Sequence, residues 1–262
     1  AAALGADVCE IYTDVDGVYT TDPRIVPAAR KVDKITSEEM LELAAAGAKV
    51  LYIRAGEYAR RHGVTLHVRS SFNNNQGTIV TGPVEGESNV EEPLIAGVAA
   101  DLSQAKITVV GVPDVPGIAA KVFTIVAAAG VNIDMIVQNV STGAGGVTDI
   151  SFTLPKTDGP ATLAALTAHS EEIRYQTLQY DDQIGKLSLV GAGMRTNAGV
   201  SAKLFTALFD AGINIEMIST SEIRISVVTR ADIIKDAVRV VHTAFELNGA
   251  EVVAEGVEQN HE

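Results

Sequence analysis

The first third of the chain carries the hydrophobic patterns of both helices and strands. An alanine-rich helical turn ends at Gly5, and an apolar run over residues 8–12 follows it as a strand. Thr36 and Glu39 match a capping box, and apolar residues at helical spacing continue to about Gly47. Later patterns predict a strand over 49–53, a helix over 55–62 and strands over 64–68 and 78–80. These elements are typical of the end of an α/β domain, and we expect its beginning to lie upstream of Ala1.

An internal repeat fills the second half of the chain. Three blocks recur in the same order and at similar spacing, at residues 106–111 and 186–191, 117–123 and 199–205, and 129–136 and 211–218. In each copy the pattern predicts a strand, a glycine-containing turn, a helix, two strands and a second helix. This order is that of a βαββαβ unit, so we expect two tandem α+β domains of the ferredoxin-like type.

The remaining elements and the domain limits follow from the same patterns. Copy one is predicted to continue with strands at 133–140 and 148–154, a helix at 159–169 and a strand at 173–180, and copy two with strands at 215–219 and 222–229 and a helix at 231–245. Two further apolar runs, at 94–99 and 250–254, are outer strands, and the sequence leaves open which sheet each completes. The predicted domains are the α/β tail at 1–82, a Gly-, Glu- and Pro-rich linker at 83–93, and the repeats at 94–182 and 183–262.

Composition excludes several functional classes. The formal net charge is −13, and the basic residues are scattered, so nucleic acid is not an expected partner. No apolar stretch reaches the roughly 18 residues of a membrane helix, so a cytoplasmic protein with no membrane partner is expected. The histidines and the single cysteine, Cys9, show no metal-ligand spacing, so no metal site built by the protein is predicted, and Cys9 is interpreted as a small buried hydrophobe.

A polar loop with nucleotide-binding chemistry follows the first strand. Residues 13–24 read Thr-Asp-Val-Asp-Gly-Val-Tyr-Thr-Thr-Asp-Pro-Arg, and open α/β sheets bind ligands beyond the carboxyl ends of their strands. Arg24 can contact phosphate, Tyr19 can flank a base, and the carboxylates can order a hydrated magnesium ion. An ordinary Asp/Gly/Pro turn has the same composition, so composition alone leaves both interpretations open.

Each repeat also offers a strand–turn–helix junction whose backbone N–H groups can receive a carboxylate. In copy one this turn spans 114–119, where Asp114 can bind an ammonium group while Asn132, Ile133 and Gln138 close over the rest of an amino acid. Both charged ends of a free amino acid are then satisfied.

Copy two differs at the matching turn. Residues 192–198 lack the acid, which predicts a poorer ammonium site, and Asn214, Ile215 and residues 219–222 are expected to face copy one across an interface instead. A structural interpretation remains for each such residue, because asparagine tolerates left-handed turns and serine or threonine often caps strand ends.

The strings TDVDGVYTTDPR, EEMLELAAAGAKVL and EYAR strongly resemble the aspartokinases, within the broader amino-acid kinase family. A kinase tail followed by two ACT-type repeats is also the aspartokinase arrangement, so the resemblance covers nearly the whole chain. It is closest to enzymes inhibited jointly by lysine and threonine. The fold that it implies is the Rossmann-like α/β end of an amino-acid kinase domain followed by tandem ferredoxin-like ACT domains.

The resemblance implies a set of site residues as well. The ATP contacts carry over to Thr13, Asp14, Tyr19, Arg24, Lys49 and Val50, with magnesium accompanying ATP. The effector-binding residues carry over to Asp114, Gly117, Ile118, Ala119, Asn132, Ile133, Asp134, Gln138, Ser141, Ser201, Asn214, Ile215, Ser221 and Glu222, of which Asp134, Ser141, Ser221 and Glu222 are similar to positions that shape the response to lysine. The phosphate-gripping segment and the aspartate-binding residues lie upstream of Ala1, so no catalytic residue is assigned.

By resemblance, the whole protein transfers phosphate from ATP to L-aspartate, and the repeats bind L-threonine and L-lysine as feedback inhibitors. We expect the isolated chain to be inactive and to assemble as a homo-oligomer or with a catalytic chain. The alternative is a non-catalytic regulatory subunit that binds the same effectors. A third hypothesis makes the repeats an oligomerisation platform only.

Overall fold

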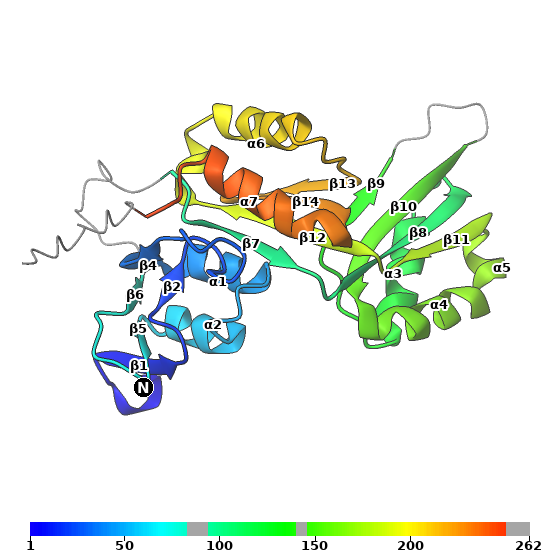
Figure 1. The fold of residues 1–262 in the computed structure, drawn as a ribbon. Helices are drawn as coiled ribbons and strands as arrows, with labels where there is room; N and C mark the ends of the chain where they lie inside the picture. Colours follow the sequence, from blue (N-terminus) through cyan, green and yellow to red (C-terminus); the bar gives the residue numbers. More distant parts are fainter. Residues whose placement is uncertain (83–93, 140–145, 250–262) are drawn as a thin grey trace, which may run out of the picture.

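The computed structural model describes residues 1–82, 94–139 and 146–249. The predicted linker at 83–93, Ser141, and the strand predicted at 250–254 lie outside these residues. In Figure 1 the second repeat, yellow to orange, lies between the amino-terminal unit in blue and the first repeat in green. Within the described ranges, no helix has the length and apolar character needed to cross a membrane.

The amino-terminal unit is a four-stranded sheet with two helices. Its strand order is β1 (Val8–Thr13), β5 (Thr65–Ser70), β6 (Thr78–Thr81) and β4 (Lys34–Thr36), and only the β5–β6 pair is antiparallel. A small ribbon of β2 (Val18–Tyr19) and β3 (Lys31–Val32) lies beside it, and a 3₁₀ turn, η1 (Ala2–Leu4), precedes it. The predicted strands at 8–12, 64–68 and 78–80 are thus confirmed.

Helix α1 (Ser37–Ala45) begins at the predicted capping box. The Thr36 hydroxyl accepts from the Glu39 backbone N–H, and the Glu39 carboxylate accepts from Thr36 in return. The helix ends before Gly47, whose φ of +114° is a conformation that only glycine adopts readily. Helix α2 (Ile53–Arg61) follows after a turn.

The strand predicted over 49–53 is wrong. Lys49 and Val50 lie in the turn between α1 and α2, and Ile53 already belongs to α2. The stretch is apolar because the connection between the two helices packs inward, and Leu51 is buried in the core of the unit. A short apolar run shows the same hydrophobic pattern in a strand and in a buried connection, which explains the error.

The first repeat has the predicted ferredoxin-like order. Its antiparallel sheet runs β11 (Thr177–Asp181), β8 (Gln104–Pro113), β10 (Val147–Pro155) and β9 (Ile136–Gln138). Helices α3 (Ile118–Ala128), α4 (Gly159–Ala168) and the short α5 (Ser170–Ile173) cover one face of this sheet. A 3₁₀ turn, η2 (Lys156–Asp158), precedes α4. The last strand begins four residues later than predicted, because the chain first completes α5 and passes Arg174 at φ +60°.

The second repeat is completed by a strand that comes before the first. Its antiparallel sheet runs β13 (Met217–Thr220), β14 (Arg224–Arg230), β12 (Ile184–Val190) and β7 (Gly97–Asp101). Helices α6 (Gly199–Asp210) and α7 (Ile234–Ala244) cover it, with the 3₁₀ turns η3 (Ala192–Arg195) and η4 (Ala231–Ile233) at their starts. The first repeat is therefore inserted in the second. Residues 97–101, which the sequence assigned to the first repeat at 94–182, belong to the sheet of the second repeat.

The burial of β7 explains why this strand completes the second sheet. Along this stretch Ile95 and Val98 join the core of the second repeat, whereas Ala96 and Ala99 join the core of the amino-terminal unit. A strand buried on both faces needs a continuous apolar sequence, which residues 94–100 provide. The strand β7 thus joins the amino-terminal unit to the second repeat.

Helix α7 carries an imidazole, His242, that is fully buried. Burial holds the pKa of His242 below its ordinary value, and the positive charge of nearby Arg30 adds to this effect, against an opposing contribution from Asn248. In the unfolded chain the imidazole takes up a proton at about pH 6.5, and in the folded chain only at lower pH.

This difference predicts a pH dependence of stability. Because the unfolded state binds the extra proton, the free energy of unfolding falls as the pH is lowered from about 6.5 towards the folded-state pKa, by at most about 1.4 kcal/mol per pH unit. Urea unfolding at pH 7.5 and 5.5 measures the loss, which His242→Gln should reduce. The exposed His169 provides the control, and an equal loss in His242→Gln and His169→Gln would contradict the assignment.

Candidate functional site

The predicted nucleotide loop leaves the carboxyl end of β1. The Thr13 hydroxyl donates to the Asp14 carboxylate at 3.2 Å. The chain then turns at Gly17, with φ +139°, where the Thr78 hydroxyl accepts from the Val18 N–H at 2.8 Å. A side chain at Gly17 would meet the Thr78 hydroxyl at 2.5 Å, so this turn needs glycine.

An arginine–aspartate pair forms the exposed part of this loop. The Arg24 guanidinium binds the Asp22 carboxylate with N–O distances of 2.8 to 3.2 Å. Hydrogen bonds from Arg24 hold the pKa of Asp22 below its usual value, and Asp22 in turn raises the pKa of Arg24. Because 88% of the Arg24 side chain is exposed, its guanidinium is free to exchange this carboxylate for a phosphate.

The structure places the other predicted ATP residues in two separate segments. Tyr19 lies in β2, and its neighbour Thr20 receives at its carbonyl a hydrogen bond of 2.7 Å from the Val98 N–H of β7. Lys49 and Val50 lie in the turn after Gly47, and Gly47 packs against Ala100 of the same strand. Both segments thus contact β7. Their contact points on this strand are about 7–10 Å apart, at 3.3 Å per residue.

The effector turn of the first repeat lies between β8 and α3. Asp114 is exposed, and its N–H donates to the Gly146 carbonyl at 2.7 Å. Gly117 adopts φ +93° as the residue before α3, so Ile118 and Ala119 begin the helix, where the Ile118 N–H donates to the Val115 carbonyl at 3.4 Å and the Ala119 N–H lies in the first turn. This is the geometry expected for receiving a carboxylate.

The remaining predicted effector residues are distributed over both repeats. Asn132, Ile133 and Asp134 precede β9 and Gln138 ends it, whereas Ser201 lies in α6. Asn214 and Ile215 precede β13, and the Asn214 carbonyl accepts from the Thr229 hydroxyl at 2.8 Å. Ser221 and Glu222 form the turn between β13 and β14, and Glu222 pairs with Arg195 at 3.1 Å.

Two crossed ion pairs join the repeats. Lys186 at the start of β12 binds Asp134 of the first repeat, and Lys106 at the start of β8 binds Glu216 of the second. The two lysines are equivalent in the repeat, as are the two acids, so the pairs are related by an approximate twofold exchange. The equivalent Met135 and Met217 are buried between them, with Ile184 and Val228.

Sequence inspection missed this contact, although the sequence holds its signal. Both copies open their first block with lysine, in KITVVG and KLSLVG, and both place an acid in the third, in NIDMI and NIEMI. A charged pair repeated at matching positions of two tandem domains is the signal that could have predicted a symmetric contact.

The crossed pairs fix where the predicted effector residues lie relative to each other. Glu216, two residues after Asn214, contacts Lys106 near the start of β8, whereas Asp114 follows the end of that strand. Asp114 comes eight positions after Lys106, which is at most about 26 Å at 3.3 Å per residue. Asn214 itself is exposed, and its carbonyl bonds Thr229 of its own repeat, so its contact with copy one stays a prediction.

The turn of the second repeat is in contact with the amino-terminal unit. The Ala192 N–H donates to the Glu39 carboxylate at 2.8 Å, and Arg224 binds Glu42 at 2.9 Å. Arg195 lies 3.7 Å from Glu38. In this chain the second turn is therefore a docking contact for α1.

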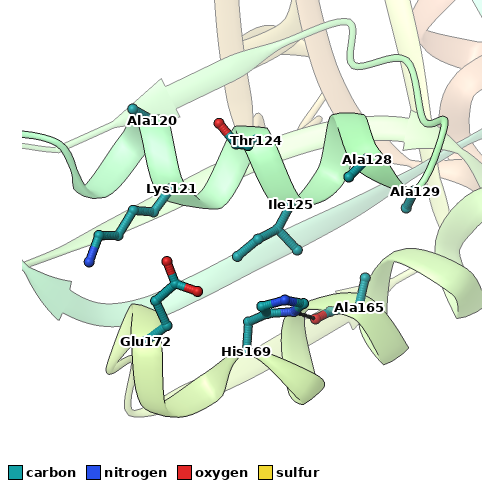
Figure 2. Close-up of a pocket in the computed structure, with 9 residues that line it drawn as sticks. All are labelled: Ala120, Lys121, Thr124, Ile125, Ala128, Ala129, Ala165, His169 and Glu172. Carbon is teal, nitrogen blue, oxygen red and sulfur yellow. Dashed lines mark hydrogen bonds between the residues drawn. The ribbon is translucent and has the colours of Figure 1, made fainter.

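The helical face of the first repeat bears a hollow of about 640 Å³ between α3 and the α4–α5 pair (Figure 2). Figure 2 shows mostly alanine and isoleucine side chains in it, with Lys121 and Glu172 at one end and the His169 imidazole hydrogen-bonded to the Ala165 carbonyl. None of the predicted effector residues lines it. A similar hollow of about 490 Å³ lies between α6 and α7.

The fold and these sites define a class. Residues 1–70 match the amino acid kinase family, and residues 107–169 and 187–245 match the ACT domain. The protein class is therefore a kinase-domain end joined to two ACT domains, and the predicted fold class is confirmed. Across residues 1–82, 94–139 and 146–249, no group of three or more His, Cys, Asp or Glu side chains is arranged to hold a metal ion.

The comparisons with individual proteins narrow this class. The chain is 57% identical to an aspartokinase of Mycobacterium tuberculosis over 96% of its own length. A crystal structure of aspartokinase alpha and beta subunits contains a chain that is 45% identical and matched over 99% of its length, with 58% of the present chain and a TM-score of 0.55. The chain belongs to the aspartokinase family, as its sequence predicted.

A third relative is E. coli aspartokinase III, known in two crystal states. Its complexes with aspartate and ADP, and with lysine and aspartate, match 93% of this chain and 53% of theirs at 28% identity, with TM-scores of 0.77 and 0.72. The present chain spans 59% of the length of the curated aspartokinases that it matches first.

Proposed function

We propose that this chain is part of an aspartate kinase, which transfers the γ-phosphoryl group of ATP to the side-chain carboxylate of L-aspartate. The products are 4-phospho-L-aspartate and ADP, in the first step towards lysine, threonine and methionine, in the cytoplasm. The observation that carries the proposal is the 57% identity to an aspartokinase over nearly the whole chain. The aspartate and ADP bound by the E. coli relative support the substrates.

In this proposal the chain supplies part of the ATP site. Thr13 and Asp14 anchor the nucleotide, Tyr19 and Val50 line the adenine region, and Arg24 and Lys49 steady the phosphates that carry magnesium. Phosphoryl transfer mostly requires positioning and charge neutralisation, which suits exposed cations beside a rigid sheet.

The two repeats supply feedback control. We infer that the turn at Asp114 binds the amino and carboxyl groups of L-threonine or L-lysine, and the lysine bound by the E. coli relative supports this ligand class. Asp114 follows the end of β8, whereas Glu216, two residues after Asn214, contacts Lys106 near its start, so a site that uses both Asp114 and Asn214 needs a second copy of the chain. Effector binding then favours an inhibited arrangement by about 1–3 kcal/mol per ligand.

A regulatory subunit is the second candidate. The alpha and beta subunits of a relative support it, because a whole chain of that structure matches only 58% of the present one. Such a subunit would bind the same effectors and assemble with a catalytic chain.

One set of assays tests these proposals. The isolated chain and its full-length parent are assayed for ADP formation that depends on both ATP and aspartate, and the chain is titrated with threonine and lysine by calorimetry. We expect activity only in the parent, and heat with at least one effector. A parent without activity would overturn the kinase proposal, and heat without any active parent would favour the regulatory subunit. No heat would leave the repeats as an oligomerisation platform.

The Asp114 assignment has its own test. Asp114→Ala should abolish threonine binding, because it removes the charge that pairs with the ammonium group, while the melting temperature stays within about 2 °C since the side chain is exposed. Glu171→Ala removes another exposed carboxylate from the same repeat and serves as the control. Equal threonine affinity in the two variants would refute the assignment.

A further inference from the structure

The segment that follows the nucleotide loop is built into the second repeat. Val26 is buried in the core of that repeat, and Ile25 and Ala29 pack against it. The backbone is held as well, because Arg239 of α7 donates to the Ile25 carbonyl at 3.2 Å and the Gly249 N–H donates to the Ala28 carbonyl at 2.9 Å. Residues 20–30 thus belong to the amino-terminal unit by sequence and to the second repeat by packing.

At the start of this segment, Thr20 and His242 form a fully buried joint. Neither residue is exposed to solvent, and the Thr20 hydroxyl lies 2.9 Å from the His242 Nε2 atom. The same hydroxyl lies 3.1 Å from the Leu247 carbonyl oxygen and accepts from the Arg30 N–H at 3.0 Å. One threonine oxygen therefore ties together the loop, helix α7 and the residues that follow it.

The Thr20 hydroxyl carries a single hydrogen and has two acceptors within reach. These are the Leu247 carbonyl at 3.1 Å and the His242 Nε2 atom at 2.9 Å, and the tautomer of His242 decides which of them receives the hydrogen. Burial favours the neutral imidazole, in keeping with the lowered pKa of His242. Replacing either side chain leaves buried polar groups unpaired.

We propose that Thr20 and His242 are positioning residues for ATP, which hold the nucleotide loop in its binding conformation against the second ACT repeat. The inference rests on the proposed kinase function. Tyr19 precedes Thr20 directly, and Arg24 lies four residues beyond it, inside the segment that the repeat holds. A change in the second repeat that moves α7 therefore reaches the nucleotide loop directly through the contacts of residues 20–30, without passing through the first repeat.

The test compares Thr20→Val with Thr20→Ser and with a matched control. Valine keeps the shape of Thr20 but removes the hydroxyl, and serine restores the hydroxyl. Thr162→Val is the control, since Thr162 is equally buried and loses a single hydrogen bond to the Asp158 carbonyl in the first repeat. His242→Gln removes the other partner of the joint.

Two readouts are taken. In the isolated chain, Thr20→Val should speed hydrogen exchange of the amides of residues 14–30 and of the end of α7 by about tenfold, with no change in the first repeat. In the full-length parent, the KM for ATP should rise by about tenfold while kcat stays within about twofold, because the loop binds the nucleotide and does not carry out the chemistry. His242→Gln should behave likewise, and Thr20→Ser should restore both values.

Each outcome decides the inference. Equal exchange in Thr20→Val and Thr162→Val would overturn the joint whatever the parent catalyses. A change in kcat alone, or no rescue by Thr20→Ser, would overturn the positioning role. Faster exchange in a parent that has no kinase activity would instead refute the proposed function and leave the joint standing as a structural contact.

Discussion

Asp134→Asn should lower the free energy of unfolding by about 3 kcal/mol, near the low end for a broken buried ion pair. Its partner Lys186 exposes only 1% of its side chain, so loss of the carboxylate leaves an ammonium group without a counter-charge in the contact between the repeats. The cost is not larger because Asp134 itself is 28% exposed and water can reach the site. Urea unfolding followed by circular dichroism measures it.

The second crossed pair provides a control within the same interface. Glu216 binds Lys106, which is 20% exposed, and lies 3.3 Å from Arg230, which is 44% exposed and also pairs with Asp181. Both cations reach water when the carboxylate is lost, so Glu216→Gln should cost only about 1 kcal/mol. Adding Lys186→Met to Asp134→Asn should recover most of the loss, since no charge then remains buried. Equal losses for the two single variants would show that burial of Lys186 does not set the cost. Because Asp134 is also a proposed effector residue, a drop in lysine affinity without lost stability would assign it to the ligand instead.

Gly47→Ala should destabilise the chain by about 3 kcal/mol or more. Two penalties combine there: the φ of +114° is strained for any residue with a side chain, and the new methyl group would lie 2.4 Å from the Ala100 carbonyl oxygen. To relieve the clash, α1 must move away from β7, together with the turn that holds Lys49 and Val50. Chemical denaturation gives the loss, and ATP-analogue affinity of the full-length parent should fall with it.

Gly63→Ala separates the two penalties. Gly63 also has a positive φ, of +63°, but open space where its methyl group would lie, so we expect a loss of about 1 kcal/mol from backbone strain alone. If Gly47→Ala costs no more than Gly63→Ala, the close approach of the turn to β7 is not maintained in solution.

The positions of the local elements could be predicted from sequence because their causes are local. The capping box at Thr36 and Glu39, the glycine that ends α1 and the period of α3 and α6 each act within a few residues. The repeat also revealed the ferredoxin-like order of both ACT domains, since three matching blocks require the same element sequence. The strand predicted at 49–53 was wrong because Leu51 is apolar for its contact with α1 and α2, which periodicity cannot distinguish from a sheet contact.

The sequence by itself thus determined most of the elements, the two repeats and the residue types of both candidate sites. Only the tertiary structure decided that β7 completes the second sheet, that Asp134 and Glu216 cross to lysines of the opposite repeat, and that the contact of Glu216 lies at the end of β8 remote from Asp114. It also decided that His242 contacts Thr20, 222 residues away. The physical reason is that strand pairing and buried charge depend on which surfaces meet, and residues distant in sequence carry no local pattern that reports their neighbour in space.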